Sequence, residues 1–523
     1  MNLYINFIIF FIISFLYFCS VVGYGKLITN KNSIYFENYL NGSILLLILS
    51  YVIYISIGTN LIINSIIIFI GLILHFFNKK KFKSISTKSI FFLFLSVFSI
   101  LIISKTHEDF NLYHYFTISE IFNHNLRIGV THLNERFFHS SLLALNQSFL
   151  VLPYLDFKLV HLVPFFIYFS AIGYFFTILF SIKIKNSEVF YSLLCLMIML
   201  IKFNRLSEFG YDYVGQFILL IVFHKIYFLN NDNNEIIKAI LYFVLTILIK
   251  PTCLLFSPIM LFILYKKNIY FYKNVTKLNY VLIVSLSIIL FSSSFFKTGC
   301  IFYPLKETCF SAKSISWSIE EVVKKNSNTV SFWAKGYYAQ DKTKYKKIDN
   351  QKLYNQNFNW LKYWIELHFF YKIFEFLLVL FGLNFLIYFY FVKNKTFLND
   401  RKKDRLILLF LSFLSIIFWL NTIPQFRFGF SSIIILIFIF CDCLFNLKIF
   451  FDKKKFYHLL IISLIVLNVK NINRIQSELV RNDFYKFKNF PFYNEIVIKN
   501  DYSNFNIKKI FHIEIIDQVK KNN

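Results

Sequence analysis

Long apolar runs alternate with short polar segments over most of the chain. A helix of about 20 mainly apolar residues crosses the roughly 30 Å hydrocarbon core of a bilayer. About fourteen runs fit this description, several of them short, which predicts about 12 to 14 spans. They lie near residues 3–22, 43–58, 60–77, 89–104, 159–182, 188–203, 211–229, 237–250, 252–266, 278–296, 366–392, 406–421, 430–450 and 456–470. The pattern predicts an all-α, polytopic transmembrane bundle.

Composition supports this fold class. Of the 523 residues 57% are hydrophobic and only 16% are charged, which excludes a water-soluble globule of this length. The formal net charge of +28 could by itself indicate a nucleic-acid partner. The basic residues, however, stand in short clusters between apolar runs, whereas a nucleic-acid site gathers them on one water-facing patch. We therefore expect a lipid bilayer and no nucleic acid as partner.

The basic clusters also predict orientation, because Lys and Arg in short loops are retained on the cytoplasmic side. Four clusters, at residues 79–88, 266–277, 393–405 and 448–455, fall on one side when the spans are counted. The predicted organisation is: helices 1–104, first outer loop 105–158, helices 159–296, second outer loop 297–365, helices 366–470 and outer tail 471–523. This organisation is that of a multi-pass protein of a bacterial inner membrane with both termini outside.

The inner loops are too short to hold a catalytic domain. The chain also contains neither a GxxxxGKS nor a GxGxxG sequence. An ATPase or a cytoplasmic nucleotide-sugar domain is therefore excluded, and polar chemistry is expected on the outer face.

The first outer loop opens with HEDFNLYHYF, which places Glu108 and Asp109 directly after a span, followed by Tyr113 and His114. Adjacent carboxylates at a helix end can bind a divalent metal or act as a general base beside a lipid phosphate. The simpler alternative is that they only solvate the helix end. Nearby polar residues favour a site: Glu135, Arg136 and six of the eleven histidines, His107, His114, His124, His132, His139 and His161. The cofactor is left open, with Mg²⁺ or Mn²⁺ as candidates.

Other charged residues lie at the predicted outer ends of spans. Arg205 and Asp212 flank the start of one span, and Lys250 precedes Pro251 between two apolar runs. A charge at membrane depth costs about 2.5–3.5 kcal/mol on insertion scales and usually faces a partner or a cavity. Arg427, in NTIPQFRFGF, has the planar guanidinium that grips phosphate groups. The alternatives are that Lys250 only reaches water and that Arg427 only anchors a lipid headgroup.

The second outer loop is rich in aromatic residues. Trp317 and Trp333 are candidates for stacking on a sugar, whereas Trp360 and Trp364, just before a span, are predicted to lie in the membrane interface. Cys300 and Cys309 lie in the same loop, where a local disulfide is one option. The other five cysteines, Cys19, Cys195, Cys253, Cys441 and Cys443, are predicted to be small core residues.

A family resemblance adds to these observations. The stretches EDFNLYH, LNERFFHSS, RLSEFGYD, ILIKP, GCIFYPLKETCF, SISWS and PQFRFG look like uncharacterised bacterial polytopic membrane proteins similar to GT-C-type glycosyltransferases. The resemblance covers roughly residues 105–430, and its more specific signals are D-x-x-L-Y-H and Y-P-x-x-x-T-C-F, which contains Tyr303. It implies transfer of a sugar from a polyprenyl-phosphate donor on the outer face. It assigns the catalytic acidic residue of the first outer loop to Asp109, with Glu108 as neighbour.

The expected function is therefore glycosyl transfer in cell-envelope glycan assembly, with a lipid-linked sugar as partner. Arg136 and Arg427 would neutralise the lipid phosphate. One alternative is an O-antigen-type polymerase or ligase, which would use Arg205 and Arg427. Another is a transporter or flippase of lipid-linked sugars. The sequence leaves the oligomeric state open.

Overall fold

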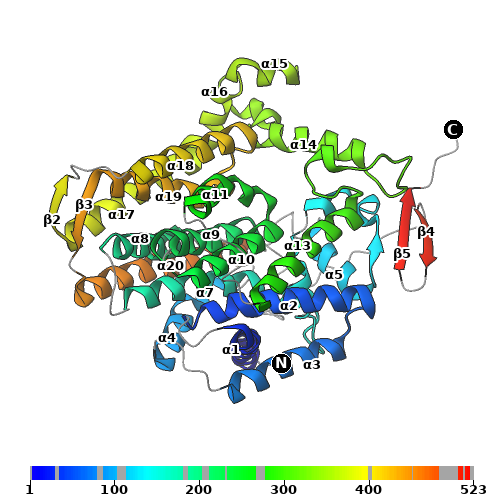
Figure 1. Ribbon diagram of the computed structural model, residues 1–523, viewed down its shortest axis with the longest axis horizontal. Coiled ribbons are helices and arrows are strands. Elements are labelled where there is room, and N and C mark those ends of the chain that lie inside the picture. Colours follow the sequence, from blue (N-terminus) through cyan, green and yellow to red (C-terminus); the bar gives the residue numbers. More distant parts are fainter. Residues whose placement is uncertain are drawn as a thin grey trace.

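Helices account for most of the chain in the computed structural model (Figure 1). The structure describes residues 3–29, 34–78, 86–102, 113–139, 141–180, 186–202, 211–229, 232–266, 277–397, 403–449, 451–481, 505–510 and 513–518. The helices of the first half are α1 (Leu3–Ile28), α2 (Glu37–Ser56), α3 (Leu61–Phe77), α4 (Thr87–Val97), α5 (Tyr115–Asn123), α6 (Ala144–Ser148), α7 (Leu162–Leu179), α8 (Asn186–Lys202), α9 (Tyr211–Phe228), α10 (Asn233–Ile249) and α11 (Ser257–Lys266). Those of the second half are α13 (Lys277–Thr298), α14 (Glu320–Ala334), α15 (Gln351–Asn355), α16 (Leu361–Trp364), α17 (Glu375–Phe391), α18 (Lys403–Thr422), α19 (Phe426–Leu444) and α20 (Lys453–Arg481).

Within the described residues, each of the fourteen apolar runs forms mainly helix, and the run 430–450 ends in a strand, Phe445–Ile449. Within the described ranges, eight helices are long and apolar enough to cross a membrane, fewer than the predicted 12 to 14. Three shorter apolar helices, Leu61–Phe77, Lys88–Ile100 and Pro251–Lys266, add to them. The chain is thus a mainly helical multi-pass membrane protein, and it contains two small sheets that the apolar pattern did not predict.

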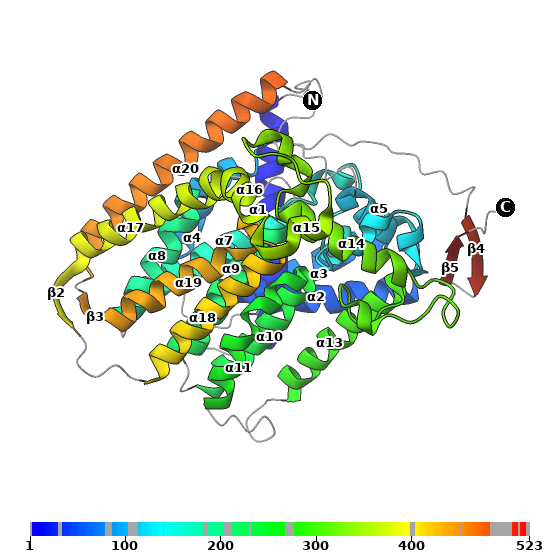
Figure 2. The same ribbon diagram turned by 90° about the horizontal axis from the view of Figure 1, so that it is seen from above.

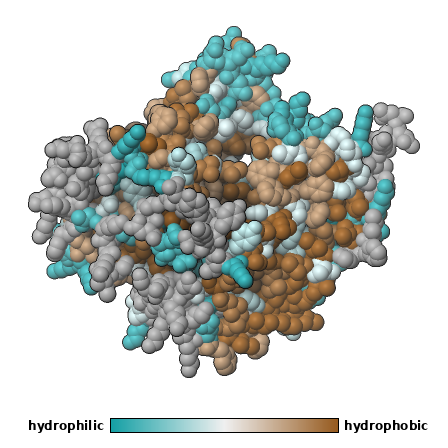
Figure 3. All heavy atoms as spheres, in the orientation of Figure 1, coloured by the Kyte–Doolittle hydropathy of each residue, from teal (hydrophilic) through white to brown (hydrophobic). Residues whose placement is uncertain are grey.

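The bundle has a buried centre and an apolar outside. Almost every residue of α7 is buried, and α8, α9 and α10 are similarly enclosed, whereas α3, α13, α17 and α18 expose large apolar side chains. In Figures 1 and 2, α8, α9, α10 and α17 to α20 run side by side. Figure 3 shows a hydrophobic face over α2, α3 and α13 and a hydrophilic cap over α14 to α16. Such continuous apolar surface fits contact with lipid.

One end of the bundle is joined by β2 (Val392–Phe397) and β3 (Phe445–Ile449), which pair antiparallel and continue from α17 and α19. The opposite end carries β4 (Phe505–Ile510) and β5 (Ile513–Gln518), as Figure 1 shows. The two small sheets therefore lie at opposite ends of the molecule.

A buried ion cluster lies where α2, α9 and α10 meet. Nζ of Lys225, a fully buried residue, lies 2.6 Å from Oε1 of Glu37 and also binds Glu235. Lys238 binds the same two carboxylates, at 2.6 Å to Oε1 of Glu235 and 3.6 Å to Oε2 of Glu37. Both carboxylates stand in the first turns of their helices and Lys225 in the last turn of α9, which suits the helix dipoles. The charges balance, and they tie three helices together.

The segment predicted to be the first outer loop (residues 105–158) contacts the C-terminal tail (residues 471–523) through a three-stranded sheet. In it β5 pairs parallel with β1 (Arg127–Ile128) and antiparallel with β4. Nε of Arg127 lies 2.6 Å from Oε2 of Glu514, and its Nη1 lies 2.9 Å from Oε1 of buried Glu120. Arg127 therefore joins the tail to α5.

Replacing Arg127 by alanine should release β4 and β5 from this loop and cost about 1–3 kcal/mol of local stability. Burial already raises the pKa of Glu120, and without Arg127 that pKa rises further. The folded variant then favours the protonated form of Glu120, because the ionised form is buried without its partner. The loss of stability is therefore largest above the raised pKa of Glu120, and it becomes smaller as the pH falls below that pKa. Limited proteolysis of the C-terminal tail at pH 8 and pH 5 measures how far the tail is released at each pH. Lys306→Ala, an exposed change in the other outer loop, is the control; equal cleavage of both variants would contradict the prediction.

Candidate functional site

Three of the charged residues selected from the sequence meet at one point. Asp212, in the first turn of α9, forms an ion pair with Lys250, whose Nζ lies 2.7 Å from Oδ1 of Asp212. Its Oδ2 lies 3.1 Å from Nε of Arg427, in the first turn of α19. Asp212 is buried, while the side chains of Lys250 and Arg427 are 20% and 33% exposed. One buried carboxylate thus holds two cations that still reach a surface.

The register between α9 and α19 fixes this meeting. Four residues after Asp212 and Arg427 stand Gln216 and Ser431, so each pair faces the same way on its helix. Oε1 of Gln216 accepts hydrogen bonds from the backbone N–H of Ser431 at 3.1 Å and from its hydroxyl at 2.6 Å. These buried bonds lock the two helices one turn away from the charges.

Aromatic rings support both cations. The Phe428 ring lies 5.3 Å from Nζ of Lys250 and 5.2 Å from Cζ of Arg427. The Trp333 ring of α14 lies 5.3 Å from Cζ of Arg427 on the side of the second outer loop. Cation–π contacts of this kind orient a charge without neutralising it.

The turn before Arg427 is held by hydrogen bonds from three sides. Nε1 of Trp364 donates to the carbonyl of Pro424 at 2.7 Å, and Nε1 of Trp419 donates to that of Gln425 at 2.9 Å. The Gln425 side chain donates to the carbonyl of Ala334 at 3.1 Å, next to Trp333. The turn and the second outer loop therefore form one packed unit that positions Arg427.

Trp360 and Trp364 were predicted to lie in the membrane interface, and this prediction is wrong. Both are buried, at 1% and 5% exposure. The Trp360 ring lies 5.1 Å from Nζ of Lys335, and Trp364 packs on Trp419 with ring centroids 6.2 Å apart. Their indole rings fill the space between the second outer loop and α18, so their place before a span reflects packing within the protein.

The first outer loop enters the site through Tyr113 and His114. Their rings lie 4.1 Å apart, and the buried His114 ring lies 4.7 Å from that of Tyr211, the neighbour of Asp212. His114 also interacts electrostatically with Asp212. The Tyr211 hydroxyl donates to the Gln147 side chain, whose amide donates to the carbonyl of Val160 at 2.8 Å. The last two residues of the D-x-x-L-Y-H motif are thus fixed beside the carboxylate of Asp212.

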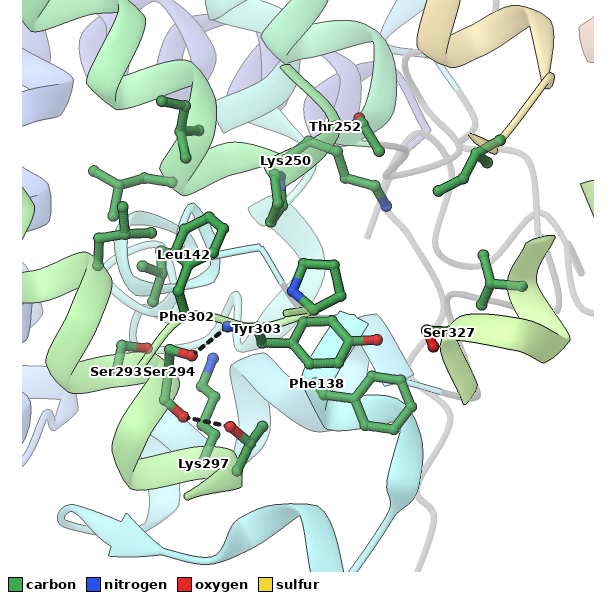
Figure 4. A pocket seen from close by; sticks show the side chains of 18 of the residues that line it. Phe138, Leu142, Lys250, Thr252, Ser293, Ser294, Lys297, Phe302, Tyr303 and Ser327 are labelled. Atoms are coloured by element: carbon green, nitrogen blue, oxygen red, sulfur yellow. Dashed lines mark hydrogen bonds between the residues drawn. The ribbon is translucent and has the colours of Figure 1, made fainter. Parts of the chain in front are cut away.

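A cavity of about 190 Å³ adjoins the charges, and Figure 4 shows it from close by. Most of its wall is apolar, with Lys250 and Phe428 on the side of the ion pairs and Lys297 on α13. Tyr303 lines it too, with its ring 5.0 Å from that of Phe138. Burial raises the pKa of Tyr303, so its hydroxyl stays neutral and can donate a hydrogen bond. The cavity therefore suits a ligand with an anionic group and an apolar part.

A comparison with known protein families matches residues 4–434 to a model described as a domain of unknown function, DUF8201. The chain belongs to the DUF8201 family. The matched region contains Asp212, Lys250 and Arg427 and ends within α19. No curated protein and no solved structure matched the chain.

In this DUF8201 chain the other predicted residues fall into three groups. Trp317 lies beside α13, where its Nε1 donates to the carbonyl of Phe295 at 3.1 Å. Arg136 is exposed on a short helix, Glu135–His139, next to Phe137 and Phe138, which line cavities. Glu108, Asp109 and Arg205 lie outside the described residues. Among the residues that the structure describes, no group of three or more His, Cys, Asp or Glu is placed to hold a metal.

The structure describes all seven cysteines. Cys300 and Cys309 form a disulfide that closes the turn carrying Tyr303. Cys19, Cys195, Cys253 and Cys443 are buried, as predicted, and Cys441 is partly buried.

The sequence analysis missed two residues of the site, Lys297 and Gln425. Lys297 stands directly after an apolar run, where it resembles any basic flanking residue, and Gln425 carries no charge. Only the cost of placing Lys297 near membrane depth could have indicated it.

Proposed function

We propose that this protein transfers a sugar from a polyprenyl-phosphate donor to an acceptor hydroxyl, at the outer face of a bacterial inner membrane, in cell-envelope glycan assembly. The observation that carries the proposal is the meeting of Lys250 and Arg427 on Asp212 beside a mainly apolar cavity. A lipid phosphate needs both features, because its headgroup is anionic and its chain is apolar.

In the proposed reaction the acceptor oxygen attacks the anomeric carbon and the carbon–oxygen bond to the phosphate breaks. The electron pair of that bond leaves with the lipid phosphate, where Lys250 and Arg427 stabilise the charge that develops. The acceptor proton passes to a carboxylate, a role that the GT-C resemblance assigns to Asp109, with Glu108 as neighbour. Asp109 precedes Tyr113 by only four residues in the sequence.

Asp212 has a different role in this scheme. A carboxylate held by two cations is a poor proton acceptor, because the neighbouring charges favour its ionised form. Its contacts at 2.7 and 3.1 Å instead set the spacing between Lys250 and Arg427. Asp212 is therefore a positioning residue, while Trp333, which is 43% exposed beside Arg427, offers a face to the sugar.

Replacing Asp109 by asparagine should abolish sugar incorporation and leave membrane insertion intact. The measurement is transfer of labelled sugar from a panel of polyprenyl-phosphate sugars by membranes that contain each variant. Asp341→Asn, at an exposed carboxylate of the second outer loop, is the matched control and should retain transfer. Normal product from Asp109→Asn would end this mechanism.

An O-antigen-type polymerase or ligase also fits the position of Arg427, because such enzymes use outer-loop arginines. Separate replacement of Arg205 and Arg427, with polymer length read on a gel, distinguishes it: shortened polymer without an effect of Asp109→Asn would favour it. Uptake of lipid-linked sugar into vesicles without any transfer would favour a flippase.

A further inference from the structure

A second lysine faces the cavity from the wall opposite Lys250. Lys297, near the C-terminal end of α13, lines this cavity and also a smaller one of about 30 Å³ beside it. Figure 4 shows the amino groups of Lys250 and Lys297 on two sides of the cavity. The mechanism proposed above uses Lys250 and Arg427 and leaves Lys297 without a role.

The charge of the site exceeds what one phosphate diester needs. Lys250, Lys297 and Arg427 supply three positive charges, and Asp212 supplies one negative charge. None of the described residues that line the larger cavity is acidic. Glu120, which lines the smaller cavity with Lys297, is balanced by its ion pair with Arg127. The site therefore carries a net charge of about +2, taking lysine and arginine as protonated and aspartate as ionised. A lipid linked to a sugar through one phosphate carries one negative charge, whereas a lipid linked through a diphosphate carries two.

Neutral hydroxyl groups lie between the two cationic sides. Ser294 and Thr298 of α13 line the cavity, together with Tyr303. The Ser294 hydroxyl donates to the carbonyl of Cys300 at 2.9 Å and accepts from the backbone N–H of Tyr303 at 2.8 Å, which fixes the turn that presents the Tyr303 ring. Figure 4 shows the Tyr303 hydroxyl pointing toward Ser327, which also lines the cavity. The Ser294 and Thr298 hydroxyls donate to backbone carbonyls of this turn and helix and so shape the wall. A diphosphate, with more oxygens than a monophosphate, can accept a hydrogen bond from the Tyr303 hydroxyl as well as contact the cations.

We propose that the cavity binds a polyprenyl diphosphate, with one phosphate on Lys250 and Arg427 and the other on Lys297. This inference rests on the proposed function, in that it takes a lipid-linked sugar as the ligand. It specifies the headgroup of the polyprenyl-phosphate donor. A donor with a diphosphate headgroup is preferred to a donor with a monophosphate headgroup and the same lipid chain.

Binding of polyprenyl monophosphate and polyprenyl diphosphate of equal chain length to the purified full-length protein tests this. The wild type should bind the diphosphate about 10- to 100-fold more tightly, which corresponds to one additional charge-assisted contact. Lys297→Gln should remove this preference and leave monophosphate affinity nearly unchanged, and Lys297→Arg should retain it. Lys277→Gln, an exposed lysine at the other end of the same helix, is the matched control.

Equal affinity of the wild type for both lipids would overturn the proposal. A Lys297→Gln variant whose affinity for the monophosphate lipid falls as much as its affinity for the diphosphate lipid would also overturn it. Competition by inorganic pyrophosphate as strong as that of the lipid would show a soluble diphosphate as ligand and overturn the lipid assignment. Circular dichroism and size-exclusion profiles of each variant verify the fold. Because these are binding measurements, a preference for diphosphate that persists without any sugar transfer would refute the proposed function and not this inference.

Discussion

Lys225→Met should lower the free energy of unfolding by about 3–5 kcal/mol, because it leaves the buried Glu37 and the partly buried Glu235 with only Lys238 to compensate them. The expected loss is large because the Lys225 side chain is fully buried and Glu37 is 2% exposed. Thermal unfolding in detergent, followed by tryptophan fluorescence, measures the change.

Charge balance provides the rescue for this variant. Adding Glu37→Gln to Lys225→Met removes one negative charge, so one carboxylate and one lysine remain, and more than half of the lost stability should return. Lys266→Ala, which breaks the exposed pair with Asp404, is the matched control and should change stability by less than about 1 kcal/mol. A Lys225→Met variant as stable as Lys266→Ala would contradict the argument.

Arg427→Ala should lower sugar transfer by about 100- to 1000-fold, the usual effect of removing one group that stabilises the charge on a leaving oxygen. Arg427→Lys should restore only part of the activity, because a lysine cannot bind phosphate in the bidentate way of a guanidinium. Transfer at saturating donor separates an effect on turnover from one on donor binding.

The chain offers a close control for this variant. Arg405 also pairs with a buried aspartate, with its Nε 3.3 Å from Oδ2 of Asp442, but Asp442 lies at the other end of α19 from Arg427. Arg405→Ala should therefore leave transfer unchanged. If both variants lose activity equally, Arg427 acts through the stability of α19 and not through the phosphate.

Much of the fold could be predicted because apolar periodicity is a local property. Within the described residues every apolar run forms mainly helix, although fewer helices than expected reach the length and hydropathy of a span. Asp212 and Lys250 were found from the cost of a charge near membrane depth, and Arg427 from the fit of its guanidinium to a phosphate group. Their mutual contacts could not be predicted, because one sequence does not reveal which distant helices pack together. The two-residue strand β1 is too short to leave a sequence pattern.

The buried ion cluster was missed for a related reason. Glu37, Glu235 and Lys238 stand near helix ends, where charged side chains are usually exposed to water, so the sequence pattern does not indicate that they are paired inside the protein. Only the folded arrangement of α2, α9 and α10 buries Glu37 and Lys238 and partly buries Glu235. The tryptophans show the reverse error, since Trp364 next to a span fits the membrane interface and the protein interior equally well.

The ion pairs on Asp212 also set an order for biogenesis. Its partners arrive from α10, which follows directly, and from α19, which is synthesised only after α13, the second outer loop, α17 and α18. During synthesis the carboxylate therefore has Lys250 but not Arg427 as an ion-pair partner for a long interval. A ribosome-nascent chain arrested before α19 would hold an unfinished centre, so the last large helical hairpin, not the first, completes the protein's charged pocket.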